Sequence, residues 1–380
     1  MEVKQKLKKA FIILLAVSML AGVFALTSCS GNTSGTNTSG GNTTSNDTNS
    51  STSGGKQEVN VYNWGEYIDE SIFADFTAET GIKVNYSTFQ SNEEMYAAMK
   101  LGGTDYDVLI PSDYMVQRLI SEDMLEKLDF SNIPNFEMIS EDFQNPEYDP
   151  KNEYSVPYMW GTVGIIYNSA LIEDEITSWS ALFDEKYTGQ ILMFNNPRDA
   201  VGIALKMLGY SLNTTSETEI SEAFAALEQQ KPILQAYVMD QIYDKLENNE
   251  AMIGPYYAGD YIVMKETNPD LAFVLPVEGS NVFIDAMCIP KGAANKENAE
   301  LFINFMTSND VCIANMDETG YISANGEAAA IYGGDLDEDD YAVQFPETGI
   351  LDKCEPFLNL PENILALYDS MWVDLKSKNQ

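Results

Sequence analysis

The 380-residue sequence contains no histidine. This absence excludes catalytic triads built on an imidazole base, metal sites with histidine ligands and histidine pH switches. Basic residues are scarce too, because 21 Lys and Arg stand against 59 Asp and Glu, which gives a formal net charge of −38. Such a chain repels nucleic acid and attracts cations, so we expect no nucleic-acid partner.

Cysteine is almost as rare, with four residues in the whole chain. Apart from Cys29 there are three, an odd number: Cys288, Cys312 and Cys354. A disulfide could engage only two of these three, and the sequence does not fix the pairing.

The start of the chain has the pattern of a secretory signal peptide over residues 1–28. Four lysines precede an uncharged apolar run over residues 10–26. The run ends in Leu26, Thr27, Ser28 and Cys29, which resembles the lipobox of bacterial lipoproteins. That resemblance implies cleavage before Cys29, acylation of Cys29 by lipid such as palmitate, and a location on the extracytoplasmic face of the cell membrane. An uncleaved membrane anchor is the alternative, although the run is short for a span of about 20 residues.

Residues 29–57 are expected to form a tether after the lipidated cysteine. Beyond Cys29 they are almost entirely Gly, Ser, Thr and Asn, which cannot bury enough apolar surface to order a chain. Residues 1–28 carry four Lys and one Glu, a net charge of +3, so the rest of the chain carries −41.

From residue 58 onward about 320 residues remain. Because a single hydrophobic core rarely supports a chain of this length, we expect two lobes. Strand patterns over 59–62, 82–86 and 107–110 alternate with helix patterns over 70–79 and from 91 to about 102. This alternation predicts a parallel sheet with helices on both faces. Ligands bind such sheets at the carboxyl ends of the strands.

The residues at the end of the first strand are suited to binding an organic cation. Trp64, Glu66 and Tyr67 place two aromatic rings and a carboxylate within four residues. Aromatic faces attract ammonium groups by roughly 0.5 to 2 kcal/mol each, and a carboxylate adds a charge-assisted hydrogen bond of about 1.5 to 3 kcal/mol. The alternative is that the rings pack in the core and Glu66 is a solvated turn residue.

Six stretches extend this pattern across the chain, in order, at residues 62–67, 76–84, 86–93, 157–161, 200–210 and 320–321. With them the sequence resembles the spermidine/putrescine-binding proteins of bacterial ABC importers, over residues 59 to about 376. The resemblance implies an α/β, two-lobed periplasmic-binding-protein-like (type II) fold with a ligand cleft between the lobes. Lobe 1 would comprise 58–161 plus 284–328, and lobe 2 would comprise 162–283 plus 329–380.

By the same resemblance the protein is a monomeric binding protein without a cofactor, not an enzyme, and its partners are a polyamine and the membrane permease of an ABC transporter. Its ligand site would combine an aromatic box with acids that bind the ligand nitrogens. The implied box is Trp64, Tyr67, Tyr257, Phe283 and Tyr321, with Ser112 and Tyr114 beside it. The implied acids are Glu66, Asp199, Asp260 and Asp285.

Several of these positions have a second interpretation. Asn196, Pro197 and Asp199 also form a good helix start, which explains Asp199 without a ligand. Tyr257 and Asp260 flank two small residues that allow close approach of the backbone. Phe283 and Asp285 lie on one face of an expected strand, where an unpaired acid is costly, so a ligand amine is the favoured partner of Asp285.

Three departures from the family pattern bear on specificity. Gly65 stands where the family commonly has a hydroxyl, Asn196 stands where spermidine binders carry a second acid, and a glutamine near the C-terminal end has no clear counterpart around Leu358. The choice between spermidine and putrescine therefore stays open.

Other classes of function compete with this interpretation. The pair Tyr256 and Tyr257 resembles the paired tyrosines of ferric-ion-binding proteins. Glu66 and Asp285 could serve a carboxylate-pair glycosidase as acid and base. A purely structural surface lipoprotein is the third alternative.

Overall fold

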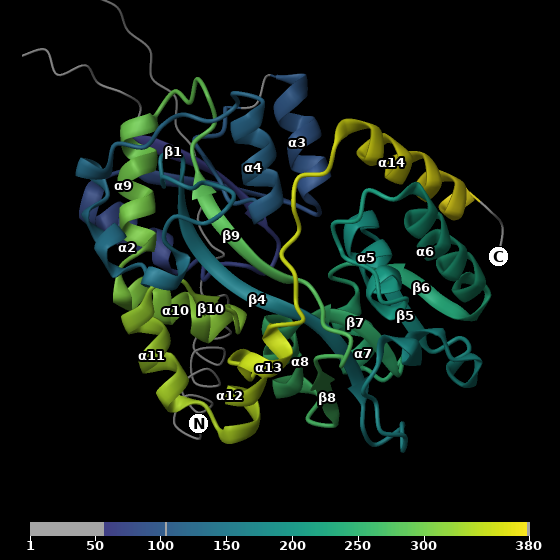
Figure 1. The fold of residues 1–380 in the computed structure, drawn as a ribbon. Helices are drawn as coiled ribbons and strands as arrows, with labels where there is room; N and C mark the ends of the chain where they lie inside the picture. Colours follow the sequence, from purple (N-terminus) through teal and green to yellow (C-terminus); the bar gives the residue numbers. More distant parts are fainter. Residues whose placement is uncertain (1–56, 103–104, 378–380) are drawn as a thin grey trace, which may run out of the picture. The chain divides into compact units, whose positions relative to one another are not determined.

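The computed structural model describes residues 57–102 and 105–377 (Figure 1). The predicted signal peptide, Cys29 and the tether lie outside these residues. The strands are β1 Glu58–Trp64, β2 Lys83–Phe89, β3 Val108–Leu109, β4 Ser155–Asn168, β5 Ile191–Phe194, β6 Leu234–Val238, β7 Ile253–Tyr257, β8 Leu271–Val274, β9 Val282–Cys288 and β10 Ile322–Ser323. The helices are α2 Ile72–Thr80, α3 Asn92–Leu101, α4 Asp113–Ser121, α5 Pro197–Met207, α6 Glu217–Gln230, α7 Ile242–Glu247, α8 Ala258–Thr267, α9 Lys296–Met306, α10 Asn309–Thr319, α11 Gly326–Asp335, α12 Glu338–Gln344, α13 Thr348–Leu351 and α14 Glu362–Ser377.

The predicted alternation of strands and helices at the start of the domain is confirmed. Helix α2 ends at Gly81, which adopts the left-handed conformation at φ 73° that glycine tolerates best. The Ser91 side chain caps α3 by accepting from the Glu94 N–H at 3.1 Å. Asn196 caps α5 in the same way, accepting from the Arg198 N–H at 2.9 Å.

The strands pair in the order β2-β1-β3-β9-β4-β7-β5-β6, and β8 and β10 also pair with β4. The predicted parallel pairing holds for β1 with β2 and β3, and β5 is parallel to β6 and β7. At the centre the prediction of a parallel sheet is wrong, because β4 is antiparallel to β7, β8 and β9. The pattern of buried side chains along a strand does not indicate whether its neighbouring strands run parallel or antiparallel to it.

Strand β4 links two groups of elements. Its first half, Ser155 to Thr162, pairs with β9, whereas its second half, Val163 to Asn168, pairs with β7 and β8. Figure 1 shows β4 and β9 running together between the group that includes α2 and α9 and the group that includes α5 and α6. Most of the 14 residues of β4 are buried, as expected for a central strand.

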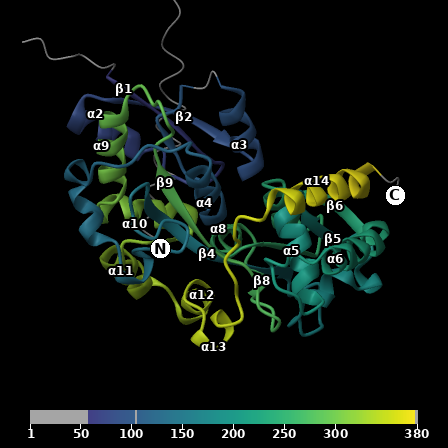
Figure 2. The same cartoon turned by 45° about the horizontal axis from the view of Figure 1, so that its top comes forward.

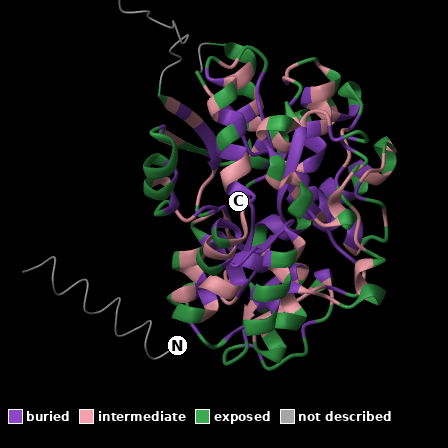
Figure 3. Ribbon diagram, turned by 90° about the vertical axis from the view of Figure 1, so that its left-hand side faces the viewer, coloured by how far each residue is buried: buried purple, intermediate pink, exposed green. Residues whose placement is uncertain are grey.

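The two halves of β4 contribute to different hydrophobic cores. Figure 3 shows the buried residues concentrated in the interior and the exposed ones on the outer helices. One core combines side chains from β5, β6, β7, α5, α6 and α14. Another combines β1, α2, β3, β9 and α9. Helix α14 lies against α5 and α6 (Figure 2), so the C-terminal end of the chain returns to the first of these cores.

A pair of adjacent residues in α9 tests the packing of the second core. Phe302 is fully buried, with its ring edge-on to Phe76 at 5.3 Å, whereas Leu301 is 37% exposed. We expect Phe302→Ala to lower the free energy of unfolding by about 3 to 5 kcal/mol because it leaves a cavity, and Leu301→Ala to lower it by less than about 1 kcal/mol. Urea denaturation measures both, and equal losses would contradict the assigned core.

Candidate ligand-binding site

One pocket brings together all eleven residues that the sequence predicts for the ligand site, and it contains about 730 Å³ of space not filled by protein atoms. These residues are Trp64, Glu66, Tyr67, Ser112, Tyr114, Asp199, Tyr257, Asp260, Phe283, Asp285 and Tyr321. The pocket lies where parallel strands end, since β1, β2, β5, β6 and β7 each contribute residues at or just beyond their carboxyl ends. This is the position expected for ligands of such sheets.

Aromatic rings in edge-to-face contact form one wall of the pocket. The Tyr67 and Tyr321 rings lie 4.7 Å apart between centroids, and the Tyr257 and Phe283 rings lie 5.4 Å apart. Phe283 also contacts Tyr321, with ring centroids 6.0 Å apart. The half-buried Trp64 packs on Phe89, and its indole N–H is buried without a hydrogen-bond partner in the part of the chain that the structure describes. The wall therefore presents apolar ring faces together with an unused donor.

Asp285 is positioned by strand β9 and is only 4% exposed. Its Oδ2 accepts from the Tyr67 hydroxyl at 2.7 Å, whereas its Oδ1 is buried and makes no hydrogen bond of ordinary geometry among the described residues, with the Ser112 hydroxyl close enough to favour the charged carboxylate. Burial raises the pKa of Asp285 to about 6, although the hydroxyls of Ser112 and Tyr67 act in the opposite direction. An unpaired buried acceptor is costly, so this atom is suited to binding an N–H donor from a ligand.

Asp199 lies in the first turn of α5 and is also buried. The expected helix start is confirmed, with Asn196 as the N-cap, Pro197 at the start of the helix and Asp199 in its first turn. The Asp199 carboxylate also lines the pocket and accepts from the Asn196 amide at 2.8 Å and the Tyr257 hydroxyl at 3.2 Å. Burial raises the pKa of Asp199 to about 7.

Asp260, in the first turn of α8, completes a set of three buried carboxylates. It accepts from the Tyr243 hydroxyl at 2.6 Å and from the Tyr321 hydroxyl, and burial raises its pKa to about 7. Gly259 is required for this arrangement, because a Cβ atom there would lie 2.4 Å from Cδ2 of Tyr321. The small residues between Tyr257 and Asp260 thus allow the close approach that the sequence predicts.

The remaining predicted residues lie toward the edges of the pocket. Glu66 is exposed and adopts a positive φ of 48°, a conformation uncommon for residues other than glycine. Ser112 and Tyr114 both accept a hydrogen bond from the Asn92 amide at 3.1 Å. The Tyr114 hydroxyl in turn donates to Glu93 at 3.0 Å.

Sequence reasoning did not assign a site role to several pocket residues, among them Gln90, Asn92, Arg198, Met239, Asp240, Asn281 and Phe357. Gln90 directly follows β2 and Asp240 is the second residue after β6, so the rule that ligands bind at the carboxyl ends of strands would have found them. Arg198 and Phe357 carry no such signal, because only the tertiary fold places the Arg198 guanidinium 4.5 Å from the centroid of the Phe357 ring.

The tyrosine pair that suggested iron binding is engaged differently. The Tyr256 hydroxyl donates to Asp240 at 3.1 Å and the Tyr257 hydroxyl donates to Asp199. Burial, together with these nearby carboxylates, raises the pKa of both tyrosines well above the usual value, which disfavours the tyrosinates that would bind Fe(III). Within residues 57–102 and 105–377, no group of three or more Cys, Asp or Glu could hold a metal ion.

Two further expectations concern cysteines and the membrane. Cys288 and Cys312 are buried free thiols, and Cys354 is a half-buried free thiol. None of the helices in the described part of the chain is both long enough and apolar enough to span a bilayer.

Comparisons with known proteins agree on one family. Residues 71–342 match the family model of bacterial extracellular solute-binding proteins. The chain is 35% identical to the spermidine/putrescine-binding periplasmic protein of Salmonella typhimurium over 318 residues, which is 83% of this chain and 90% of that protein.

Solved structures give the same result. The spermidine/putrescine ABC transporter substrate-binding protein of Streptococcus pneumoniae is 35% identical, with a TM-score of 0.71 over 84% of this chain and 99% of that chain. A Treponema pallidum lipoprotein is 27% identical, with a TM-score of 0.74 over 84% of this chain and 99% of that chain. This likeness confirms the expected two-lobed periplasmic-binding-protein-like α/β fold. The chain therefore belongs to the bacterial extracellular solute-binding proteins, a family of binding proteins and not of enzymes.

Proposed function

We propose that this protein captures polyamines, spermidine or putrescine or both, for an ABC importer. The observation that carries the proposal is the pairing of an aromatic wall with three buried carboxylates, none of which forms a salt bridge with a described residue. The relatives named as spermidine/putrescine-binding proteins support the same ligand class.

The chemistry of a polyamine matches each part of this pocket. Its ammonium groups form charge-assisted hydrogen bonds with Asp199, Asp260 and Asp285, and its methylene chain lies against the rings of Tyr257, Phe283 and Tyr321. Each charge-assisted bond contributes about 1.5 to 3 kcal/mol, and exclusion of water strengthens the attraction between ammonium groups and rings. The positive charge of the ligand also offsets the free-energy cost of burying these negatively charged carboxylates.

We further propose how the protein works in the cell envelope. Cys29 carries the lipid that anchors the protein at the extracytoplasmic face of the membrane, and residues 30–57 tether the binding domain. The lobes, 58–161 plus 284–328 and 162–283 plus 329–380, close around the ligand. The closed monomer then docks on a permease that a cytoplasmic ATPase drives. Mass spectrometry of the membrane-extracted protein tests the lipid on Cys29.

The alternatives receive no support from the relatives, which are transport proteins for polyamines and not for iron. Isothermal titration calorimetry with putrescine and spermidine decides between these classes. We expect saturable 1:1 binding of at least one amine. Absence of heat with both amines, on a protein shown to be folded, would overturn the proposal, and a tyrosinate-to-iron charge-transfer band on adding Fe(III) would favour the iron alternative.

Asp285→Asn tests the central carboxylate. We expect this variant to weaken binding by about 2 kcal/mol or more, a roughly 30-fold rise in Kd, because a charge-assisted bond becomes a neutral one. Asp374→Asn, an exposed acid on α14, is the matched control and should leave Kd unchanged. An unaltered affinity in Asp285→Asn would remove Asp285 from the site.

Binding should also depend on pH. The pKa values of Asp199 and Asp260 are about 7, and that of Asp285 is about 6, in the ligand-free protein. Because an ammonium ion binds the charged carboxylate, the affinity should fall as the pH is lowered from 8 to 5 and these groups become protonated. Titrations near pH 6.5 in two buffers of different ionisation enthalpy should show protons released on binding, and a buffer-independent heat would contradict this.

The stability of the ligand-free protein should follow the opposite trend. The folded pKa of each of these carboxyls lies above the ordinary value of 3.8, so the folded state binds more protons than the unfolded state between about pH 4 and 7. Their contribution therefore lowers stability as the pH rises through this range. Thermal melts of the parent protein and of Asp260→Asn at pH 5 and 8 measure this contribution. The difference in melting temperature between pH 5 and pH 8 should be smaller in the variant than in the parent protein.

A further inference from the structure

The two ends of the pocket differ in charge. At one end the Arg198 guanidinium is 3% exposed and lies 4.5 Å from the centroid of the Phe357 ring and 5.3 Å from that of Tyr114. This permanent cation immediately precedes Asp199 in the chain and lowers the pKa of its carboxyl, whereas burial and the nearby Glu93 carboxylate raise that pKa. Asp199 therefore has a fixed protein cation and a second carboxylate beside it before any ligand binds.

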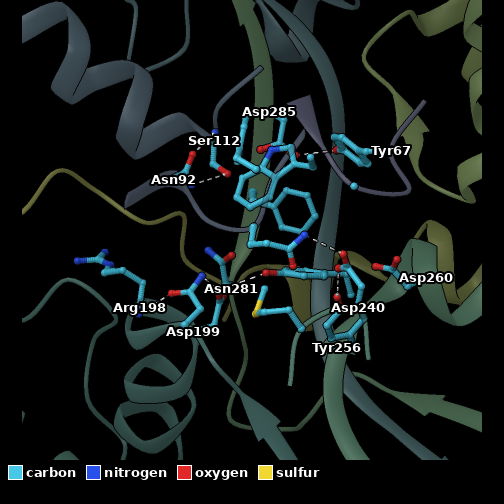
Figure 4. Close-up of a pocket in the computed structure, with 18 of the residues that line it drawn as sticks. Tyr67, Asn92, Ser112, Arg198, Asp199, Asp240, Tyr256, Asp260, Asn281 and Asp285 are labelled. Atoms are coloured by element: carbon cyan, nitrogen blue, oxygen red, sulfur yellow. Dashed lines mark hydrogen bonds between the residues drawn. The ribbon is translucent and has the colours of Figure 1, made fainter. Parts of the chain in front are cut away.

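At the opposite end lies Asp240, just beyond strand β6 (Figure 4). Its Oδ1 accepts from the Tyr256 hydroxyl at 3.1 Å, and its Oδ2 accepts from the Gln90 amide at 3.3 Å. Both donors are neutral, and the described residues form no salt bridge with Asp240. Its charge is held in position by hydrogen bonds without being cancelled.

The absence of a side chain at Gly65 opens this end. A Cβ atom on Gly65 would lie 3.0 Å from Oδ2 of Asp240, which is tighter than ordinary contact. Here the pocket adjoins a second hollow with about 960 Å³ of space not filled by atoms, and the two share the lining residues Gly65, Glu66, Tyr67, Gln90 and Asp240. No lysine or arginine lines that hollow within the described part of the chain. A ligand too long for the inner pocket can extend in this direction.

Charge balance connects these observations, and the following step rests on the proposed polyamine function. Of the acids near the inner pocket, Asp199 already has the Arg198 guanidinium as a neighbour, whereas the described residues form no salt bridge with Asp240 at the Gly65 end. We propose that Asp240 determines specificity for longer polyamines by binding the additional ammonium group of a triamine, whose arm extends past Gly65.

The test compares Asp240→Asn with Asp244→Asn in the full chain, by calorimetry with spermidine and putrescine. Asp244 is an exposed acid four residues further along, outside the pocket, so the control makes the same change of charge. We expect Asp240→Asn to raise the Kd for spermidine at least tenfold and that for putrescine less than threefold. Asp244→Asn should change neither by more than twofold.

Gly65→Ala provides an independent variant that keeps every charge. Its Cβ atom would displace the Asp240 carboxylate, so it should also weaken spermidine binding more than putrescine binding. Circular dichroism and thermal melts establish whether each variant is folded. If Asp240→Asn does not fold, the comparison of the two amines with Gly65→Ala decides the question.

The outcomes separate this inference from the proposed function. If the parent protein binds neither amine, the proposed function fails. If it binds only putrescine, or if Asp240→Asn affects the two amines equally or not at all, the function stands and the role of Asp240 is overturned. Equal effects of Asp240→Asn and Asp244→Asn would show that Asp240 acts only through the overall negative charge of the protein, which would overturn its proposed contact with the ligand.

Discussion

The rest of the site depends on the hydrogen bond between a tyrosine hydroxyl and a buried carboxylate. Tyr67 donates to Asp285, Tyr257 to Asp199, and Tyr321 to Asp260. A neutral donor fixes the direction of a carboxylate but leaves its negative charge in place, whereas an arginine or lysine would cancel that charge. The same three tyrosines supply ring surface to the pocket, so one residue type both orients the acids and forms the wall. The pocket is thereby pre-organised for an organic cation, at the expense of burying negative charge.

The fold makes this arrangement possible because it directs strand ends from two cores to one place. Trp64 ends β1 in one core, and Tyr257 ends β7 in the other. Asp285 lies on β9, which pairs with the long strand β4 that connects both groups. The Asp285 carboxylate is thus held on a strand that pairs with the connecting strand β4, and not on a loop of either group, which fixes its position in the pocket.

Local order could be predicted from the sequence, whereas long-range pairing could not. Gly81, Ser91 and Asn196 determine where helices end or begin through their own backbone and side-chain chemistry, so short windows of sequence were enough. The antiparallel pairing of β4 with β7 and β9 depends on residues 86 to 133 positions away, from Tyr167↔Ile253 to Ser155↔Cys288, which no local period encodes. Resemblance to a family located the eleven predicted site residues in the pocket. It did not find Asp240 or Gln90, whose contact spans 150 positions, nor the place of Arg198 against Phe357.

The two departures at Gly65 and Asn196 act at opposite ends of the pocket, and their effects reinforce one another. At the Arg198 end, Asn196 caps α5 and donates to Asp199, which an acid in its place could not do without repelling the neighbouring carboxylate. That end therefore holds one carboxylate fewer beside a fixed cation. At the other end, Gly65 leaves room for the Asp240 carboxylate to approach the backbone of the segment that follows β1. Under the proposed polyamine function, the two positions therefore both affect where carboxylates lie along the pocket, Asn196 through its contact with Asp199 and Gly65 through its close approach to Asp240.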